Sequence, residues 1–137
     1  RFRVTDESGT CLVDLVAALE TLKTGLGKHW ENTAVVAVSA FGRTARFNGT
    51  TGTDHGTGGL ALLAGGLLAN GAGGKVLTTR WPGVGADQLH EERDLMPTDD
   101  VRRYLGWLAS DLFNLDPETI NRELFPKVEL GQRLKLI

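Results

Sequence analysis

The residues best suited to chemistry lie between positions 39 and 59. This stretch opens with Phe-Gly-Arg-Thr at 41–44 and closes with Thr-Asp-His-Gly at 53–56. A carboxylate beside an imidazole suits a zinc, manganese or iron ion, and the same pair could act as general acid and base. Arg43 offers a pair of donors to a phosphate, sulfate or carboxylate group. Adjacent side chains normally diverge, but the surrounding glycines would let Asp54 and His55 turn toward one point.

The same residues also have purely structural interpretations. An Asp-His pair in a turn can cap the backbone or pack, and an arginine after a strand can be an ion-pair partner. Two protein ligands are too few for zinc, which takes at least three. His90 is a candidate third ligand, although its spacing does not require that role. Cys11 is the only cysteine, so it excludes an internal disulfide and is expected to be a buried apolar residue.

The composition describes one ordinary domain with an unusual segment. The chain has 137 residues, of which 41% are hydrophobic and 23% charged, and its formal net charge is −2. This balance gives no basic excess for nucleic acid, and no apolar run approaches the roughly 20 residues of a transmembrane helix. Glycine is in excess: ten of the 18 glycines fall between positions 49 and 74. We therefore expect a specially shaped segment there.

The elements that would position this segment follow from hydrophobic spacing. A leucine-rich stripe predicts a helix over about 10–25, and the β-branched run at 33–39 predicts a strand that is covered on both faces. Residues 40–59 have no periodicity, which is typical of a functional loop at a strand end. Residues 60–64 and 75–81 predict a hairpin through the turn at 70–74, with a helix over 60–68 as the alternative.

The last third of the chain predicts two helices. Thr98 is the expected N-cap of the first, with a buried stripe of Val101, Leu105, Leu108 and Leu112. Asp116 followed by Pro117 predicts the start of a second, shorter helix. Residues 128–137 alternate weakly, which predicts a terminal strand or a tail. The predicted order is α, β, long loop, β-hairpin, α, α, which is an α/β architecture.

The chain also resembles a known family. The carrying residues are the run VVAVSAFGRTARFNGTTGTDHGTGGLALLAGG, then KVLTTRWPG, DQLHEERDLMPTDDVRRYLGWLASDLFNL and ELFP. Together they resemble the C-terminal part of an uncharacterised bacterial family whose members are exported proteins, often with twin-arginine signals. That family is placed in the sulfatase/alkaline-phosphatase superfamily. The resemblance covers about residues 12–126.

The resemblance implies a fold, a location and a site. It implies that residues 1–137 are the C-terminal portion of a larger alkaline-phosphatase-like, three-layer α/β domain, in a periplasmic or secreted protein. The nucleophile and several metal ligands of that superfamily lie in the N-terminal portion. Arg43, Thr44, Asn48, Asp54 and His55 match family residues. We predict an anion-binding group of Arg43, Thr44 and Asn48, and a divalent metal, zinc or manganese, on Asp54 and His55.

Members of this superfamily carry an Asp-His-Gly signature at the end of a strand, and two placements of that signature are open in this chain. If it corresponds to residues 53–56, Asp54 and His55 are both ligands. If it corresponds to the strand end at 39–42, Ala40 and Phe41 stand in place of both ligands, and His55 matches only a later histidine. The second placement fits the strand spacing better, because residues 35–39 run straight into it.

These observations lead to two functional hypotheses. The first is a hydrolase of small phosphate or sulfate esters in the full-length chain, with no turnover by these 137 residues alone. The second is a non-catalytic binding or cell-envelope protein of the same fold with a degenerate metal site. Because the predicted strands are few, we also expect an exposed apolar sheet edge or face, or self-association that covers it.

Overall fold

The computed structural model describes residues 7–68 and 81–137, with side chains from Leu12 onward. In chain order the elements are α1 (Glu7–Leu26), the 3-10 helix η1 (Gly27–Asn32), β1 (Val35–Val38), β2 (Gly42–Arg43), β3 (His55–Gly56), β4 (Ala61–Ala64), the 3-10 helix η2 (Ala86–Gln88), α2 (Val101–Phe113), α3 (Pro117–Thr119) and the π-helix η3 (Ile120–Leu124). Helices thus combine with small antiparallel sheets, which agrees with the α/β class at this coarse level.

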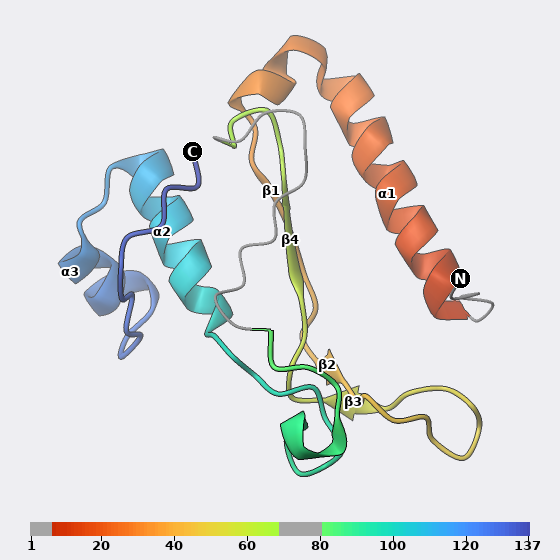
Figure 1. The fold of residues 1–137 in the computed structure, drawn as a ribbon. Coiled ribbons are helices and arrows are strands. Elements are labelled where there is room, and N and C mark those ends of the chain that lie inside the picture. The colour runs from red at the N-terminus through yellow and green to blue at the C-terminus, as the bar shows by residue number, and fades with distance from the viewer. Residues whose placement is uncertain (1–6, 69–80) are drawn as a thin grey trace.

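The central element is an antiparallel ribbon of β1 and β4. Val35 pairs with Ala64 and Val38 with Ala61, so the alternative helix over 60–68 is wrong. In Figure 1 the ribbon stands between α1 on one side and α2 with the C-terminal segment on the other. The partner strand predicted at 75–81 lies outside the described residues, apart from Trp81.

The prediction of a strand covered on both faces is wrong. One face of the ribbon, which includes Val36 and Leu63, packs against the buried cluster of the C-terminal segment. The residues of β1 are nevertheless only half-buried, and Val38 is 55% exposed. A two-stranded ribbon with a packed helix on one face leaves the other face uncovered, which is why these apolar residues remain partly open.

Helix α1 confirms the predicted helix and extends it by about one turn at the N-terminus. Its apolar stripe is largely uncovered, since Leu12 and Val16 are each 54% exposed and Leu22 is 41% exposed. Cys11 lies in α1, but its side chain is outside the described part. Among the described helices, none is both long enough and apolar enough to cross a bilayer. The open stripe is an exposed apolar surface on a helix, whereas the prediction named a sheet edge or face, and self-association stays a prediction.

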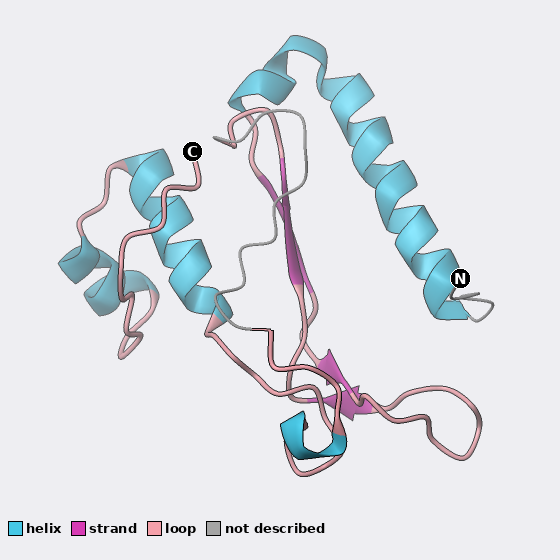
Figure 2. Cartoon of the chain, viewed as in Figure 1, coloured by secondary structure: helices cyan, strands magenta, loops and turns pink. Residues whose placement is uncertain are grey.

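The hydrophobic core lies in the last third of the chain. Six buried residues form it, and three of them come from the segment after η3: Trp107, Leu108, Ile120, Val128, Leu130 and Leu136. The backbone of that segment is fixed by side chains of α2, because the Trp107 indole and Arg103 Nε both donate to the Leu130 carbonyl at 3.0 and 2.6 Å. Figure 2 shows this segment as irregular chain beside α2.

Two details of α2 differ from the prediction. The N-cap is Asp100, whose carboxylate accepts from Arg102 N at 2.9 Å, and not Thr98. The buried face is also rotated toward Trp107, and Leu112 is 38% exposed. The terminal segment causes this rotation, because it covers the Trp107 side of the helix. The start of α3 is confirmed: Asp116 caps it and Pro117 occupies the first turn.

Candidate functional site

The stretch from 39 to 59 is less irregular than its sequence suggests. It follows β1 and folds back on itself through the short strands β2 and β3, which pair in antiparallel fashion. Gly42 pairs with Gly56, and Arg43 pairs with His55. Figure 1 shows this second ribbon at one end of the β1–β4 ribbon, with the connecting loop projecting outward. The loop therefore has a defined frame at its base.

Glycine is required where the backbones cross in this frame. A Cβ on Gly56 would stand 2.5 Å from the carbonyl carbon of Arg43, and a Cβ on Gly42 would overlap the backbone of Gly58. By contrast, a Cβ on Gly49 would meet nothing within 4 Å. Gly42 and Gly56 thus let backbone segments pack closely, and their role is not to make the chain flexible.

Arg43 and His55 lie on the same face of the β2–β3 ribbon. Directly opposed residues of an antiparallel pair project to one side of the sheet, so their exposed side chains are neighbours. Arg43 Nη1 donates to the Thr53 carbonyl at 3.2 Å. The imidazole stacks on Phe41, with ring centroids 4.4 Å apart and planes inclined by 12°. Each of the two polar side chains therefore has a contact that restrains its orientation.

Thr44 and Asn48 use their polar atoms within the loop. The buried Thr44 hydroxyl accepts from Asp54 N at 3.0 Å and donates to the Arg46 carbonyl at 3.1 Å. Asn48 Oδ1 accepts from the backbone of Thr50 and of Gly52, each at 3.0 Å. These bonds close the loop, so both residues shape it. Their assignment as anion ligands stays a prediction.

The Asp54 carboxylate and the His55 imidazole have different partners, and their joint role as metal ligands stays a prediction. Thr44 N donates to the Asp54 carbonyl at 3.1 Å, which extends the ladder to Asp54. Its Oδ1 accepts from Asn48 Nδ2 at 2.8 Å.

Asp54 and His55 gain no third metal ligand among the described residues. No group of three histidine, cysteine or acidic residues with metal-binding geometry occurs among the described residues. His90 lies in the turn that pairs with Asp94. The described residues alone therefore do not fit a complete metal site.

Sequence reasoning missed Asp94, the buried carboxylate behind this ribbon. Asp94 is 2% exposed, and its carboxylate accepts from both the amide and the hydroxyl of Thr57 and from Arg93. The hydrogen bond from Arg93, followed by those from Thr57, holds the pKa of Asp94 below its usual value. The segment 84–97 reads as a polar surface loop. Its one signal of burial is that Leu95 and Met96 follow Asp94 at once.

Comparison with known proteins places the chain in a family. A search of the curated proteins and a search of the solved structures each found no match. A family model described as a protein of unknown function, DUF1501, matches residues 5–122, which include both ribbons, the buried Asp94 and all of α2. The match thus covers the whole candidate site. The chain belongs to the DUF1501 family of proteins.

Proposed function

We propose that Arg43 and His55 form an anion-binding site for the phosphate or sulfate group of a small ester. The observation that carries the proposal is their direct pairing across the β2–β3 ribbon, on one exposed face. A guanidinium presents a planar fork of donors that matches the oxygens of such a group. An imidazole beside it can donate a hydrogen bond to the same group or exchange a proton with it.

The arrangement is also prepared before a ligand arrives. Thr53 accepts one Arg43 donor, which leaves the rest of the fork for an anion, and Phe41 holds the imidazole by stacking. Side chains that are held in position lose less rotational entropy on binding. The pair therefore suits a small, rigid anion better than a flexible chain.

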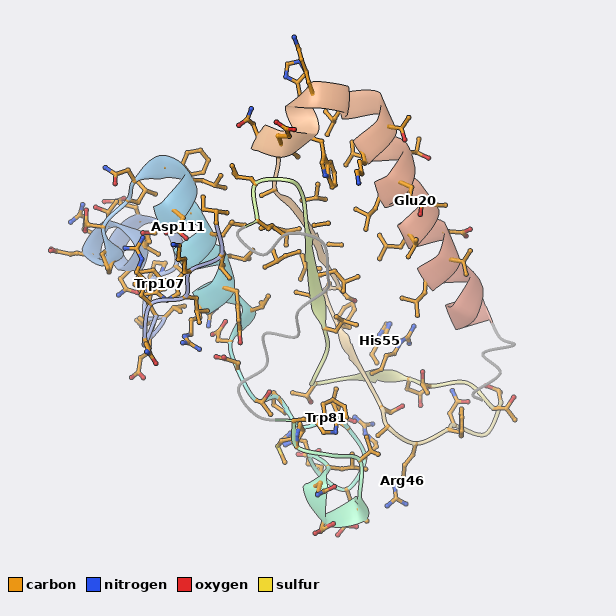
Figure 3. All side chains as sticks on the ribbon, turned by 45° about the horizontal axis from the view of Figure 1, so that its top comes forward. Glu20, Arg46, His55, Trp81, Trp107 and Asp111 are labelled. Atoms are coloured by element: carbon orange, nitrogen blue, oxygen red, sulfur yellow. The ribbon has the colours of Figure 1, made fainter. Side chains whose placement is uncertain are left out.

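A titration with inorganic phosphate tests this site directly. We expect R43A to weaken phosphate binding about tenfold or more, the loss expected for a charge-assisted donor pair. R46A is the matched control, because Arg46 is also exposed and lies on the same loop, and Figure 3 shows it pointing away from His55. Equal loss in both variants would mean that phosphate responds only to net charge.

The wider proposal is a hydrolase of the alkaline-phosphatase and sulfatase kind, exported to the periplasm or beyond. Its support is the family resemblance of residues 12–126 together with the Arg43–His55 pair. In this proposal the nucleophile lies upstream of these 137 residues, so the chain alone has no turnover. We expect the full-length protein to hydrolyse an aryl phosphate or an aryl sulfate. The 137-residue chain should hydrolyse neither. A full-length protein that hydrolyses neither ester would contradict it.

Binding of a divalent metal ion at Asp54 and His55 is a separate proposal. A zinc or manganese ion on His55 or Asp54 would need further ligands from outside the described residues, because these residues supply no third ligand beside the pair. A divalent ion in such a site would stabilise charge on an ester oxygen. Metal analysis and thermal unfolding of the full-length protein with zinc or manganese test this. A protein without bound metal whose melting temperature does not respond would overturn it.

The second candidate is a non-catalytic binding or cell-envelope protein of the same fold. The observation that favours it is the strand end at Ala40 and Phe41, where the second placement of the superfamily's signature would put the Asp-His pair. Phe41 packs on His55 and offers no ligand atom. This candidate predicts phosphate binding at Arg43 without hydrolysis of either ester by the full-length protein. The two candidates thus share the binding site and differ in turnover.

A further inference from the structure

A buried carboxylate lies directly behind the Arg43–His55 site. Asp94 has the most deeply buried carboxylate among the ion-paired acidic residues that the structure describes, with a side chain that is 3% exposed. Burying a charge is costly unless hydrogen bonds compensate for it. Here they do: Oδ2 accepts from Thr57 N at 3.0 Å and from Thr57 Oγ1 at 2.9 Å, while Oδ1 accepts from Arg93 Nε at 2.7 Å.

These bonds connect two segments that are far apart in sequence. Thr57 follows β3 directly and stands two residues after His55, while Asp94 belongs to the turn region 90–95. The backbone reinforces the connection, since Ala45 N donates to the Arg93 carbonyl at 2.9 Å and Gly58 N to the Leu95 carbonyl at 3.0 Å. The segment 93–95 thus lies along β2 and against the end of β3.

Gly58 shows how closely this segment approaches the ribbon. A Cβ on Gly58 would overlap the Leu95 carbonyl oxygen, so no side chain separates the two backbones. Arg43 N in turn donates to the Gly58 carbonyl at 3.1 Å. A displacement of Thr57 and Gly58 would therefore reach both Arg43 and His55.

We infer that Asp94 is a positioning residue for the Arg43–His55 site. By holding Thr57 it fixes the end of β3, and with it the register that places His55 opposite Arg43. The ligand in this inference, a phosphate or sulfate group, rests on the proposed function. The placement of the ribbon by Asp94 does not.

Three substitutions and one control, all in the full 137-residue chain, test the role of Asp94. D94N keeps the size of the side chain, but its amide has only one oxygen, so it cannot accept the hydrogen bonds of both Arg93 and Thr57. T57V removes the hydroxyl at nearly constant volume, and T57S restores it. E92Q is the matched control, because Glu92 is exposed in the same turn and loses the same charge. The probe is inorganic phosphate, followed through the NMR signals of the His55 ring and the Gly56 amide.

Positioning predicts a graded pattern. D94N should weaken phosphate binding about tenfold and T57V about fivefold, as expected for a lost charged and a lost neutral hydrogen bond, respectively. T57S and E92Q should bind like the unmodified chain. If D94N and T57V both bind phosphate like the unmodified chain, the inference is wrong while the proposed function stands.

A different result would separate the two claims. If the unmodified chain does not bind phosphate, the proposed function fails, and the signals of the phosphate-free chains decide the positioning claim. His55 and Gly56 signals that move in D94N and T57V but not in T57S or E92Q would support it. Signals that are unchanged in all variants would overturn it. If D94N alone fails to fold, the comparison of T57V with T57S still decides the claim.

Discussion

The C-terminal core and the β2–β3 ribbon are stabilised in different ways. The core, formed by residues 101–137, buries six apolar side chains around Ile120, which is completely inaccessible. The ribbon, with its support at 90–95, holds its shape through backbone crossings at glycines and through the polar bonds of Thr44 and Asp94. The comparison teaches that the core supplies stability without setting the site, whereas the ribbon sets the geometry of the site and adds a smaller share of stability. Substitutions should therefore separate them.

The largest expected effect is in the core. I120A should lower the free energy of unfolding by about 3 kcal/mol, because it removes three methyl-equivalent carbons from a site that cannot collapse easily. Urea denaturation measures this. L124A is the matched control on the same π-helix, since Leu124 is 46% exposed and should lose less than about 1 kcal/mol. Similar losses in the two variants would contradict the placement of the core.

The next effect is expected in the ribbon. G56A should cost about 2 kcal/mol, the range for inserting a carbon into closely packed surroundings, because the new Cβ would press on Arg43. It should also move the NMR signals of His55, which I120A should not. G49A, where the Cβ meets open space, should change neither property. If G56A is as neutral as G49A, the register of β2 and β3 is not as described.

A smaller effect is expected at the start of α2, where the chain passes from the site region into the core. D100A should destabilise the chain by about 1 kcal/mol, the usual cost of losing an N-cap. T98A should have almost no effect. Thermal unfolding of the two variants distinguishes the two possible N-caps. A larger loss of stability in T98A than in D100A would show that Thr98 is the N-cap, as the sequence predicts.

The smallest effect is expected in the pH dependence of stability. The folded-state pKa of Asp94 is lowered, chiefly by the Arg93 hydrogen bond, so its contribution is fully present above its unfolded pKa of about 4. The contribution falls away as the pH drops through the lowered, folded-state value. Urea unfolding from pH 6 downward should therefore show a shallower acid loss in D94N than in the unmodified chain. Parallel curves would mean that Asp94 is not paired as described.

The sequence predicts the elements better than their pairing. Helix α1, strand β1 and the Asp116 start of α3 follow from local signals: leucine spacing, β-branched residues and a cap before proline. The pairing of β1 with β4, and of Arg43 with His55, depends on contacts between distant segments that no local pattern encodes. Leu112 was expected to be buried and is not, because the terminal segment covers the Trp107 side of α2.

The candidate site shows the same limit. Arg43, Thr44, Asn48, Asp54 and His55 do gather in one loop and ribbon. Which partner each side chain takes could not be predicted, because the partners follow from the pairing of β2 with β3, and no local pattern encodes that pairing. Asp94 could not be predicted for a similar reason: apart from the apolar residues Leu95 and Met96 that follow it, nothing in this polar stretch indicates that its carboxylate is buried against Thr57, some 40 residues away in sequence.

The central claim is that Arg43 and His55 together bind an anion. The most direct measurement is a titration of the unmodified chain with inorganic phosphate, in which NMR signals are followed residue by residue. We predict saturable shifts centred on the Arg43 side chain, the His55 ring and the backbone of β2 and β3. Shifts that are absent, or that spread over exposed lysines and arginines without saturating, would contradict the account.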